Sequence, residues 1–294
     1  MKPRSFRLYT VAWQKIDDFG PLATARIDKV DAPLVNQFAA HLQQKGFAVI
    51  SVNNTLRTLR RALFLAFEWR LLNREPRTVV KLLPGERQRE YVLSEDDEAR
   101  VIEAAAPSVK AAITLAIDTG LRLGEISALE WSDVEMTDTN GNSTPVAVRV
   151  RDGKTKNARR RVPVTKRVAA LLETPKTTAR PDVPHVFTPQ SRRHAVSDQF
   201  LTMLFKKAVR KCNISEDCVF HSLRHTAATP MGAARTSPFV MLKFFGWSSV
   251  KIAMRYCHPD ADQLERAVAA LGKQSSRGRR GTVKDLAAHA ASLL

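Results

Sequence analysis

Apolar residues recur at three- and four-residue steps through the first part of the chain, from residue 4 to about residue 80. The clearest runs are Val35, Phe38 and Leu42, and then Leu56, Leu59, Leu63 and Phe67. This spacing places the apolar side chains on one face of a helix. Because strand-like alternation is nearly absent, we predict a helical region here.

The second of these helices has a basic side. We interpret the polar residues Asn53 and Thr55 as the start of this helix. Arg57, Arg60 and Arg61 then share a side roughly opposite part of the apolar stripe. They are candidate DNA phosphate ligands, and a solvated basic face is the alternative interpretation.

Helix breakers and polar residues at 83–90 predict an exposed connection between two domains. Ser94 followed by Asp97 is typical of a capping pair that opens a new helix. We therefore place a domain boundary near residue 88. The predicted parts are a helical domain at 1–88, a second domain at 89–273 and a polar, basic tail at 274–294.

The second domain is predicted to combine helices with a hairpin. Helical spacing covers 94–106, 108–119, a stretch through Glu130, 197–212, 221–233 and 249–256. Val146, Val148 and Val150 alternate with their neighbours, and an Asp152-Gly153 turn precedes a second extended segment at 161–164. The fold class that follows is mainly α with a small antiparallel β-sheet.

The charge balance points to a polyanionic partner. The 294 residues include 47 Lys and Arg against 29 Asp and Glu, a formal net charge of +18. Residues 1–88 hold 15 basic and 7 acidic residues, a surplus of +8 that leaves +10 for the remainder. Such a surplus favours nucleic acid, although acidic lipid or a solvated basic surface would also account for it.

Membrane and secretory signals are missing from the sequence. No apolar run approaches the roughly 20 residues of a spanning helix, and the first residues lack the apolar core of a signal peptide. Cys212, Cys218 and Cys257 are an odd number at spacings that suggest no disulfide framework. We expect a cytoplasmic protein with no membrane association.

Several side chains could together perform chemistry on a phosphodiester. Its anionic oxygens repel a nucleophile and its transition state gathers more negative charge, so an enzyme without a metal must supply fixed cations. The candidates are Arg122 in TGLRLGEISALEW, Lys154 in DGKTKNARRR, His221 and Arg224 in HSLRHT, Trp247 in FFGW and Tyr256 in MRYCHPD.

Each candidate also has an ordinary structural interpretation. Arg122 could form a surface salt bridge with Glu125. His221 and Arg224 share a helical face and could reach one phosphate, or they could be a satisfied histidine and a paired arginine. Tyr256 could be the last apolar contact of a short helix. Activation of a phenol, with its ordinary pKa of about 10, requires a positive environment.

Taken together, these segments resemble the tyrosine recombinase, or phage integrase, family. The resemblance rests on TGLRLGEISALEWSDV (119–134), HSLRHT (221–226) and FFGWSSVKIAMRYCH (244–258). It implies a two-domain architecture in which a helical core-site-binding domain precedes an α+β catalytic domain. It also implies that Tyr256 is the nucleophile and that Arg122 and Arg224 hold the non-bridging phosphate oxygens.

The resemblance further implies a reaction. Tyr256 would form a 3′-phosphotyrosyl bond and release a 5′-hydroxyl, and a 5′-hydroxyl from a partner duplex would reverse the step. Lys154 would protonate the leaving oxygen, with Lys156 as the alternative acid and a candidate DNA contact. Because bond energy is conserved, no cofactor is expected, and the sequence has no GxxxxGK[ST] nucleotide loop. No metal is expected either.

One residue departs from the family pattern. Where the family most often has histidine after the glycine of its third segment, this chain has Trp247. An indole N–H can donate to a phosphate oxygen, but it cannot shuttle a proton. His221 would then carry any acid–base role of that pair.

The implied partner is double-stranded DNA at a specific recombination site, bound by a homotetramer on two duplexes. Integration, excision and dimer resolution all remain open. The segment after about residue 262 is expected to pack on a neighbouring subunit. The few residues before residue 10 favour a two-domain recombinase without an extra N-terminal DNA-binding domain.

Three other functions compete with this one. Cys218, His221 and His225 have spacings that suit zinc ligands, but a fourth ligand is not evident. A DNA-binding protein without catalysis is the second alternative. A type IB topoisomerase, which relaxes supercoils with a similar set of residues, is the third.

Overall fold

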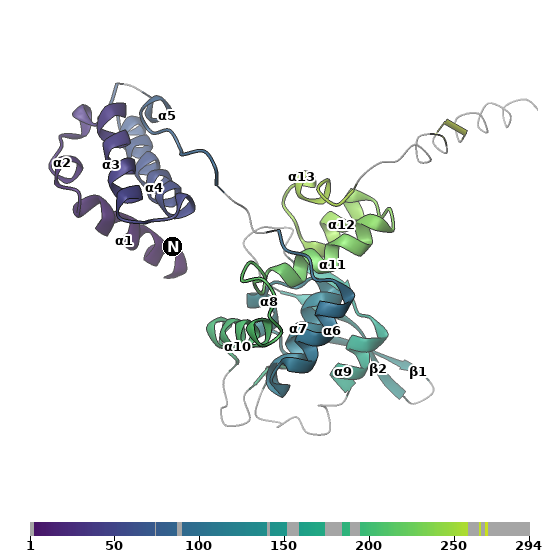
Figure 1. Cartoon of the computed structure of the whole chain (residues 1–294). Coiled ribbons are helices and arrows are strands. Elements are labelled where there is room, and N and C mark those ends of the chain that lie inside the picture. Colours follow the sequence, from purple (N-terminus) through teal and green to yellow (C-terminus); the bar gives the residue numbers. More distant parts are fainter. Residues whose placement is uncertain are drawn as a thin grey trace, which may run out of the picture. The chain divides into compact units, whose positions relative to one another are not determined.

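The computed structural model describes residues 3–73, 75–86, 90–139, 142–151, 159–173, 184–188, 195–257, 265 and 268–269. The chain divides into two compact units, Met1–Gln88 and Arg89–Leu294 (Figure 1). The described residues are mostly helical with a three-stranded antiparallel sheet, which confirms the predicted fold class. Across these residues, no helix is both long and apolar enough to cross a membrane.

The first unit is built from packed helices. They are α1 (Pro3–Asp17), α2 (Gly20–Ala23), α3 (Ala32–Gln44), α4 (Val49–Glu68) and α5 (Pro76–Val79), with a 3₁₀ turn at Ile27–Lys29. Helix α4 packs against α1, α3 and α5. The core contains the predicted apolar positions Val35, Phe38 and Leu42 of α3 and Leu56, Leu59 and Leu63 of α4.

The start of α4 corrects one prediction. The helix begins at Val49, so Asn53 and Thr55 do not start it but are buried within it. The Asn53 side chain accepts a hydrogen bond from Leu83 N–H (2.8 Å) and donates to the Leu83 carbonyl and to Glu86 (3.0 Å each). The buried amide is thus satisfied, and the beginning of the expected exposed connection is attached to α4.

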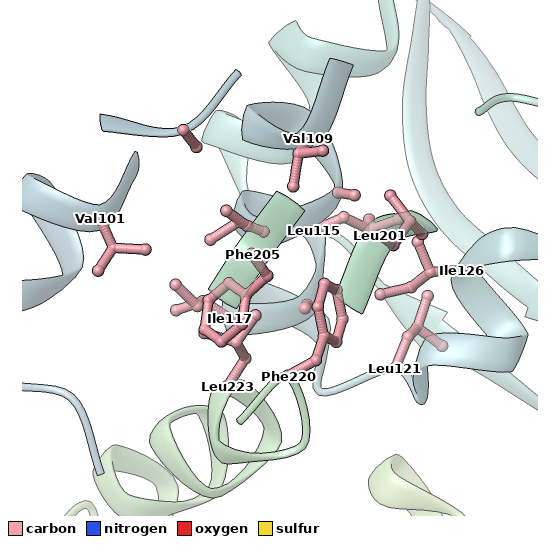
Figure 2. Close-up of a cluster of buried hydrophobic side chains, with 14 of the residues drawn as sticks. Val101, Val109, Leu115, Ile117, Leu121, Ile126, Leu201, Phe205, Phe220 and Leu223 are labelled. Atoms are coloured by element: carbon pink, nitrogen blue, oxygen red, sulfur yellow. The ribbon is translucent and has the colours of Figure 1, made fainter. Parts of the chain in front are cut away.

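The second unit surrounds α7 with other helices. Its helices are α6 (Glu95–Ala104), α7 (Pro107–Thr119), α8 (Leu123–Ser127), α9 (Lys166–Glu173), α10 (Asp198–Lys211), α11 (Ser222–Ala233), α12 (Pro238–Phe245) and α13 (Val250–Ala253), with a 3₁₀ turn at Trp131–Asp133. Helices α6, α8, α9, α10 and α11 all contact α7. Figure 2 shows Leu115 of α7 near Leu201 and Phe205 of α10, and all three are fully buried.

The structure confirms one predicted helix start in this unit and corrects other elements. The Ser94 hydroxyl accepts from Asp97 N–H at 3.1 Å and caps α6, as predicted. The prediction that a helix extends through Glu130 is wrong, because α8 ends at Ser127. Helix α13 spans only Val250–Ala253 rather than 249–256. Helix α12 was not predicted, because periodicity does not identify an apolar run this short.

The sheet has the order β1-β2-β3. Its strands are β1 (Val134–Thr139), β2 (Asn142–Val150) and β3 (Arg160–Pro163). Strands β2 and β3 pair antiparallel with Val148 opposite Val162, which confirms the predicted hairpin. Its turn, with Lys154 and Lys156, lies outside the described residues. Strand β1 was not predicted, because its sequence VEMTDT is mostly polar.

Candidate active site

A left-handed turn between α7 and α8 positions Arg122. Gly120 ends α7 with φ at 60°, a conformation that favours glycine. A Cβ atom at this position would lie 2.2 Å from the Phe245 ring, so the site also requires glycine for space. The Arg122 guanidinium then donates to the Gly246 carbonyl (3.0 Å) and to Glu125 (2.7 Å).

Glu125 connects Arg122 to a second arginine, Arg160 of β3. Its carboxylate accepts from the Arg122 N–H (2.9 Å) and from both Nη atoms of Arg160 (3.1 and 2.9 Å). The Arg160 side chain is 3% exposed, and its Nε donates to the Phe244 carbonyl at 2.8 Å. Burial raises the pKa of Glu125, but Arg160 and Arg122 outweigh it and hold this pKa below its ordinary value.

Arg160 was missed by the sequence analysis, because it stands in a run of three arginines at the expected basic end of a hairpin. The strand register decides which of these side chains points inward and which points to solvent. Arg160 lies opposite the buried Val150, whereas its neighbour Arg161 is half-exposed and pairs with Glu135 at 2.6 Å. Strand alternation was the signal that could have identified Arg160 as an inward-facing residue.

Arg224 of α11 is almost completely buried. Its Nη atoms donate to the carbonyls of Gly120 (2.5 Å) and Phe245. Its guanidinium lies 5.2 Å from the Phe245 ring centre and 5.7 Å from that of Trp247. Burial, followed by the charges of Arg122 and Arg160, lowers the pKa of Arg224 to about 9. Carbonyl oxygens orient this cation without cancelling its charge.

His221 occupies the N-cap position of α11 but makes no side-chain capping hydrogen bond. Its ring meets that of His225 edge to face, with centroids 5.3 Å apart. The residue is exposed overall. The pKa of His221 is lowered to about 4. The largest cause is partial desolvation of the imidazole ring, followed by the nearby charges of His225, Arg224 and Arg122. The imidazole is therefore neutral at physiological pH.

Tyr256 lies beyond the end of α13 and belongs to a stack of aromatic rings. The Phe245 and Trp247 centroids are 4.5 Å apart, and those of Trp247 and Tyr256 are 5.6 Å apart. Trp247 is 6% exposed. Through this stack the tyrosine ring is connected to the rings that contact Arg224.

The Tyr256 hydroxyl forms a hydrogen bond with Nδ1 of His225. Burial, then Glu90, raises the pKa of Tyr256 above its ordinary value, although Arg255 and Arg224 oppose this change. The phenol is therefore protonated at neutral pH, and its ionisation needs an acceptor for the proton.

His225 was considered in the sequence only as a possible zinc ligand. Among the described residues, no three His, Cys, Asp or Glu side chains gather as a metal-binding group, so the zinc alternative gains no support there. The signal for its position was available, because His225 follows His221 by four residues and shares its helical face.

A pocket of about 500 Å³ is lined in part by Tyr256. Its lining includes an ion pair between Arg255 and Glu90, with 3.0 Å between Nη1 and Oε1. The remaining lining residues are Val92, His225, Thr229, Gly232, Ala233 and Arg235. Tyr256 and its hydrogen-bond partner His225 thus line the same open space.

The candidate DNA-binding arginines of α4 line one hollow of the first unit. Arg57, Arg60 and Arg61 share it with Phe64 and Arg77. Arg57 also has a structural partner, since its Nη2 lies 2.6 Å from Glu86. Lys156, the fourth candidate, lies outside the described residues, as does the catalytic candidate Lys154.

Five predicted site residues therefore come together in the second unit: Arg122, His221, Arg224, Trp247 and Tyr256. Two of them are fixed guanidinium groups, and one is a phenol whose ring is held by stacking. Fixed cations beside a nucleophilic hydroxyl can stabilise the charge that develops when an anionic phosphate is attacked. The arrangement thus has the components of metal-independent phosphoryl transfer.

Comparison with known proteins identifies relatives of the second unit over most of its length. The model of the phage integrase family matches residues 91–263. The ICEBs1 integrase of Bacillus subtilis (strain 168) is 31% identical over 156 residues, which cover 50% of this chain and 42% of that protein. The tyrosine recombinase XerC of Xanthomonas axonopodis pv. citri is 24% identical over 281 residues, which cover 91% of this chain and 88% of that protein.

Solved structures share the fold. The Tn1549 transposon integrase in complex with a circular intermediate DNA gives a TM-score of 0.76 at 16% identity, covering 92% of this chain and 94% of that chain. The lambda integrase tetramer bound to a Holliday junction gives 0.69 at 17%, covering 88% and 72%.

The chain spans less than half the length of the ICEBs1 integrase that it matches. The family model nevertheless covers more than half of this chain, and the matched residues include all five that converge in the second unit. The resemblance drawn from the sequence is confirmed. This chain belongs to the phage integrase family of tyrosine recombinases.

Proposed function

We propose that this protein is a site-specific DNA recombinase that cleaves and rejoins DNA strands through a 3′-phosphotyrosyl bond to Tyr256. One observation carries the proposal. The ring of Tyr256 stacks on Trp247, and the Trp247 ring lies 5.7 Å from the buried Arg224 guanidinium. A nucleophile and a fixed cation thereby belong to one packed cluster.

Arg122 and Arg224 would bind the non-bridging oxygens of the scissile phosphate. The Gly120, Phe245 and Gly246 carbonyls orient the two guanidinium groups before DNA binds. Preorganised donors of this kind stabilise the transition state, and loss of one commonly slows a reaction by roughly 10²–10³.

The other candidates would serve the leaving group and the phosphate. Lys154 would protonate the departing 5′ oxygen, with Lys156 as the alternative acid. His221, neutral because its pKa is lowered to about 4, would donate a hydrogen bond to the phosphate. The Trp247 indole N–H would be a further donor. The proposed chemistry needs neither a metal nor a nucleotide cofactor.

Each of the two units would contact the DNA. We assign core-site DNA binding to 1–88, catalysis to 89–273 and a basic tail to 274–294. The first two parts are each suited to phosphate contact, because the chain is basic on both sides of residue 88. Arg57, Arg60, Arg61 and Lys156 are the proposed DNA contacts.

The proposed assembly is a homotetramer on two duplexes. The lambda integrase structure, a tetramer bound to a Holliday junction, has the same fold and supports this assembly. The segment after residue 262, which would pack on a neighbouring subunit, lies almost wholly outside the described residues. The three cysteines are free thiols, which suits the reducing cytoplasm where we place the protein.

The test is covalent adduct formation without magnesium. The protein first selects its site from a random-sequence duplex pool, and labelled copies of that site, nicked to trap the intermediate, are then incubated with it. We expect SDS-resistant adducts from the unaltered protein and from Tyr9→Phe, a matched control in α1, but none from Tyr256→Phe.

Two other outcomes would favour other functions. Tight binding without adducts would support the non-catalytic DNA-binding protein. Adducts accompanied by relaxation of supercoiled plasmid that lacks the selected site would support the type IB topoisomerase.

A further inference from the structure

We propose that His225 is the base that receives the phenolic proton of Tyr256 during DNA cleavage. This inference rests on the proposed function. It starts from the hydrogen bond between His225 Nδ1 and the Tyr256 hydroxyl, the atom that would attack phosphorus.

The position of His225 is constrained by its own helix. Its ring meets His221 edge to face at 5.3 Å and lies tilted against Tyr256 at 6.1 Å. Gly232, two turns further along α11, admits the tyrosine backbone, since a Cβ there would lie 2.1 Å from the Tyr256 carbonyl oxygen. The same helix thus holds the acceptor and sets its distance from the nucleophile.

The charges around His225 favour a neutral imidazole. Burial lowers the pKa of His225; Glu90, from the segment before α6, raises it, and Arg224 and Arg255 lower it. The net direction is downward. At neutral pH, His225 Nδ1 can therefore accept the phenolic hydrogen bond while Nε2 carries the ring proton.

The step balances without another reactant. The bond from the Tyr256 oxygen to phosphorus forms, the bond from phosphorus to the 5′ oxygen breaks, and the phenolic proton passes to His225 Nδ1. The departing 5′ oxygen takes a proton from Lys154. On rejoining, the 5′-hydroxyl attacks phosphorus and returns its proton to Lys154, while the His225 imidazolium returns its proton to the Tyr256 oxygen.

His225→Asn separates a base from a residue that only positions the tyrosine. The amide can still bond to the hydroxyl near the position of Nδ1, but it cannot accept the proton. We expect single-turnover cleavage of the nicked duplex to slow by roughly 10²-fold or more, with DNA affinity and melting temperature unchanged. If the asparagine variant unfolds, His225→Phe, which keeps a ring at this position, replaces it.

The pH profile gives a readout that a structural role would not change. The unaltered protein should cleave at a constant rate above the pKa of His225. The cleavage rate of His225→Asn should instead increase by about tenfold for each unit that the pH rises, because the phenol must ionise without a base. A slower variant with the flat profile of the unaltered protein would overturn the assignment of His225 as the base.

A 5′-bridging phosphorothiolate substrate provides the second arm. Sulfur leaves without protonation, so this substrate should rescue Lys154→Ala but not His225→Asn. Rescue of His225→Asn, or an unchanged rate on ordinary DNA, would overturn the inference alone. Failure of the unaltered protein to form any adduct would overturn the proposed function and this inference together.

Discussion

The rings of Trp247 and Tyr256 lie almost parallel, with 4° between their planes and 5.6 Å between their centroids. Stacking of this kind fixes the direction of the phenol, because the ring cannot turn without losing contact with the indole. At the position where the family most often has histidine, the chain thus has a residue that packs the nucleophile.

Trp247→Ala should therefore destabilise the second unit and slow cleavage. Truncation of a buried tryptophan costs about 3–5 kcal/mol, and the tyrosine loses its stacking partner. Trp247→Phe should recover most of the stability while losing the indole N–H. Thermal melting and adduct formation measure the two effects, and a Trp247→Ala protein that melts like the unaltered protein would contradict the packing role.

Gly232→Ala should abolish adduct formation with little change in DNA affinity. The added Cβ would lie 2.1 Å from the Tyr256 carbonyl oxygen, so the tyrosine backbone must move away from α11. We expect about 1–3 kcal/mol of destabilisation from this overpacking. Cleavage rate and DNA affinity, measured in parallel, test the expectation.

Gly124→Ala is the matched control for this change. A Cβ at Gly124 would meet only the Asp198 carboxylate at 3.7 Å, which is an ordinary contact. This variant should melt and cleave like the unaltered protein. Equal loss of cleavage in both alanine variants would show that helix glycines are generally sensitive and that the approach of Tyr256 is not the cause.

The Glu125 carboxylate should make stability depend on acid pH. Because Arg160 and Arg122 lower its folded pKa below 4.5 despite burial, the unfolded chain binds the proton more readily. The stabilisation is present above about pH 4.5 and is lost as the pH falls through the folded pKa. Urea unfolding across this range should show Glu125→Gln losing most stability at neutral pH, with the difference from the unaltered protein shrinking in acid.

Arg160→Ala tests the same ion pair from the other side. It leaves a buried carboxylate without its bidentate partner, a change that typically costs about 3–5 kcal/mol. Arg161→Ala, in the exposed neighbour, is the control and should change the free energy of unfolding by less than about 1 kcal/mol. Similar losses in both variants would argue against the special role of the buried pair.

The arginines that line the hollow on α4 should bind DNA through its phosphates. Arg60→Ala and Arg61→Ala are each expected to weaken binding to all duplex sequences and to reduce the salt dependence of affinity by about one charge. Arg57→Ala should also loosen the segment that contains Glu86, its partner at 2.6 Å. DNA titrations at several salt concentrations test this, and a sequence-dependent loss would indicate base contacts instead.

Much of the fold followed from local patterns. The apolar spacing of α3 and α4 predicted their buried faces correctly, because a helix repeats every 3.6 residues wherever it is packed. Strand β1 and helix α12 were missed because neither has a clear periodic pattern of its own. Strand β1 is mostly polar and α12 is short, so their positions depend on the elements that they contact, β2 for the strand and α13 and β3 for the helix.

Family membership and the chemical type of the site residues were determined by the sequence itself, since Arg122, His221, Arg224 and Tyr256 stand in recognisable segments. The partnerships among side chains were decided by the tertiary structure. Arg160 binds Glu125, 35 residues away in the sequence, because the register of β3 turns its side chain inward. Tyr256 bonds to His225, which is 31 residues away in the sequence. Such contacts depend on how closely packed elements approach, and Gly232 sets one such distance by lacking a side chain.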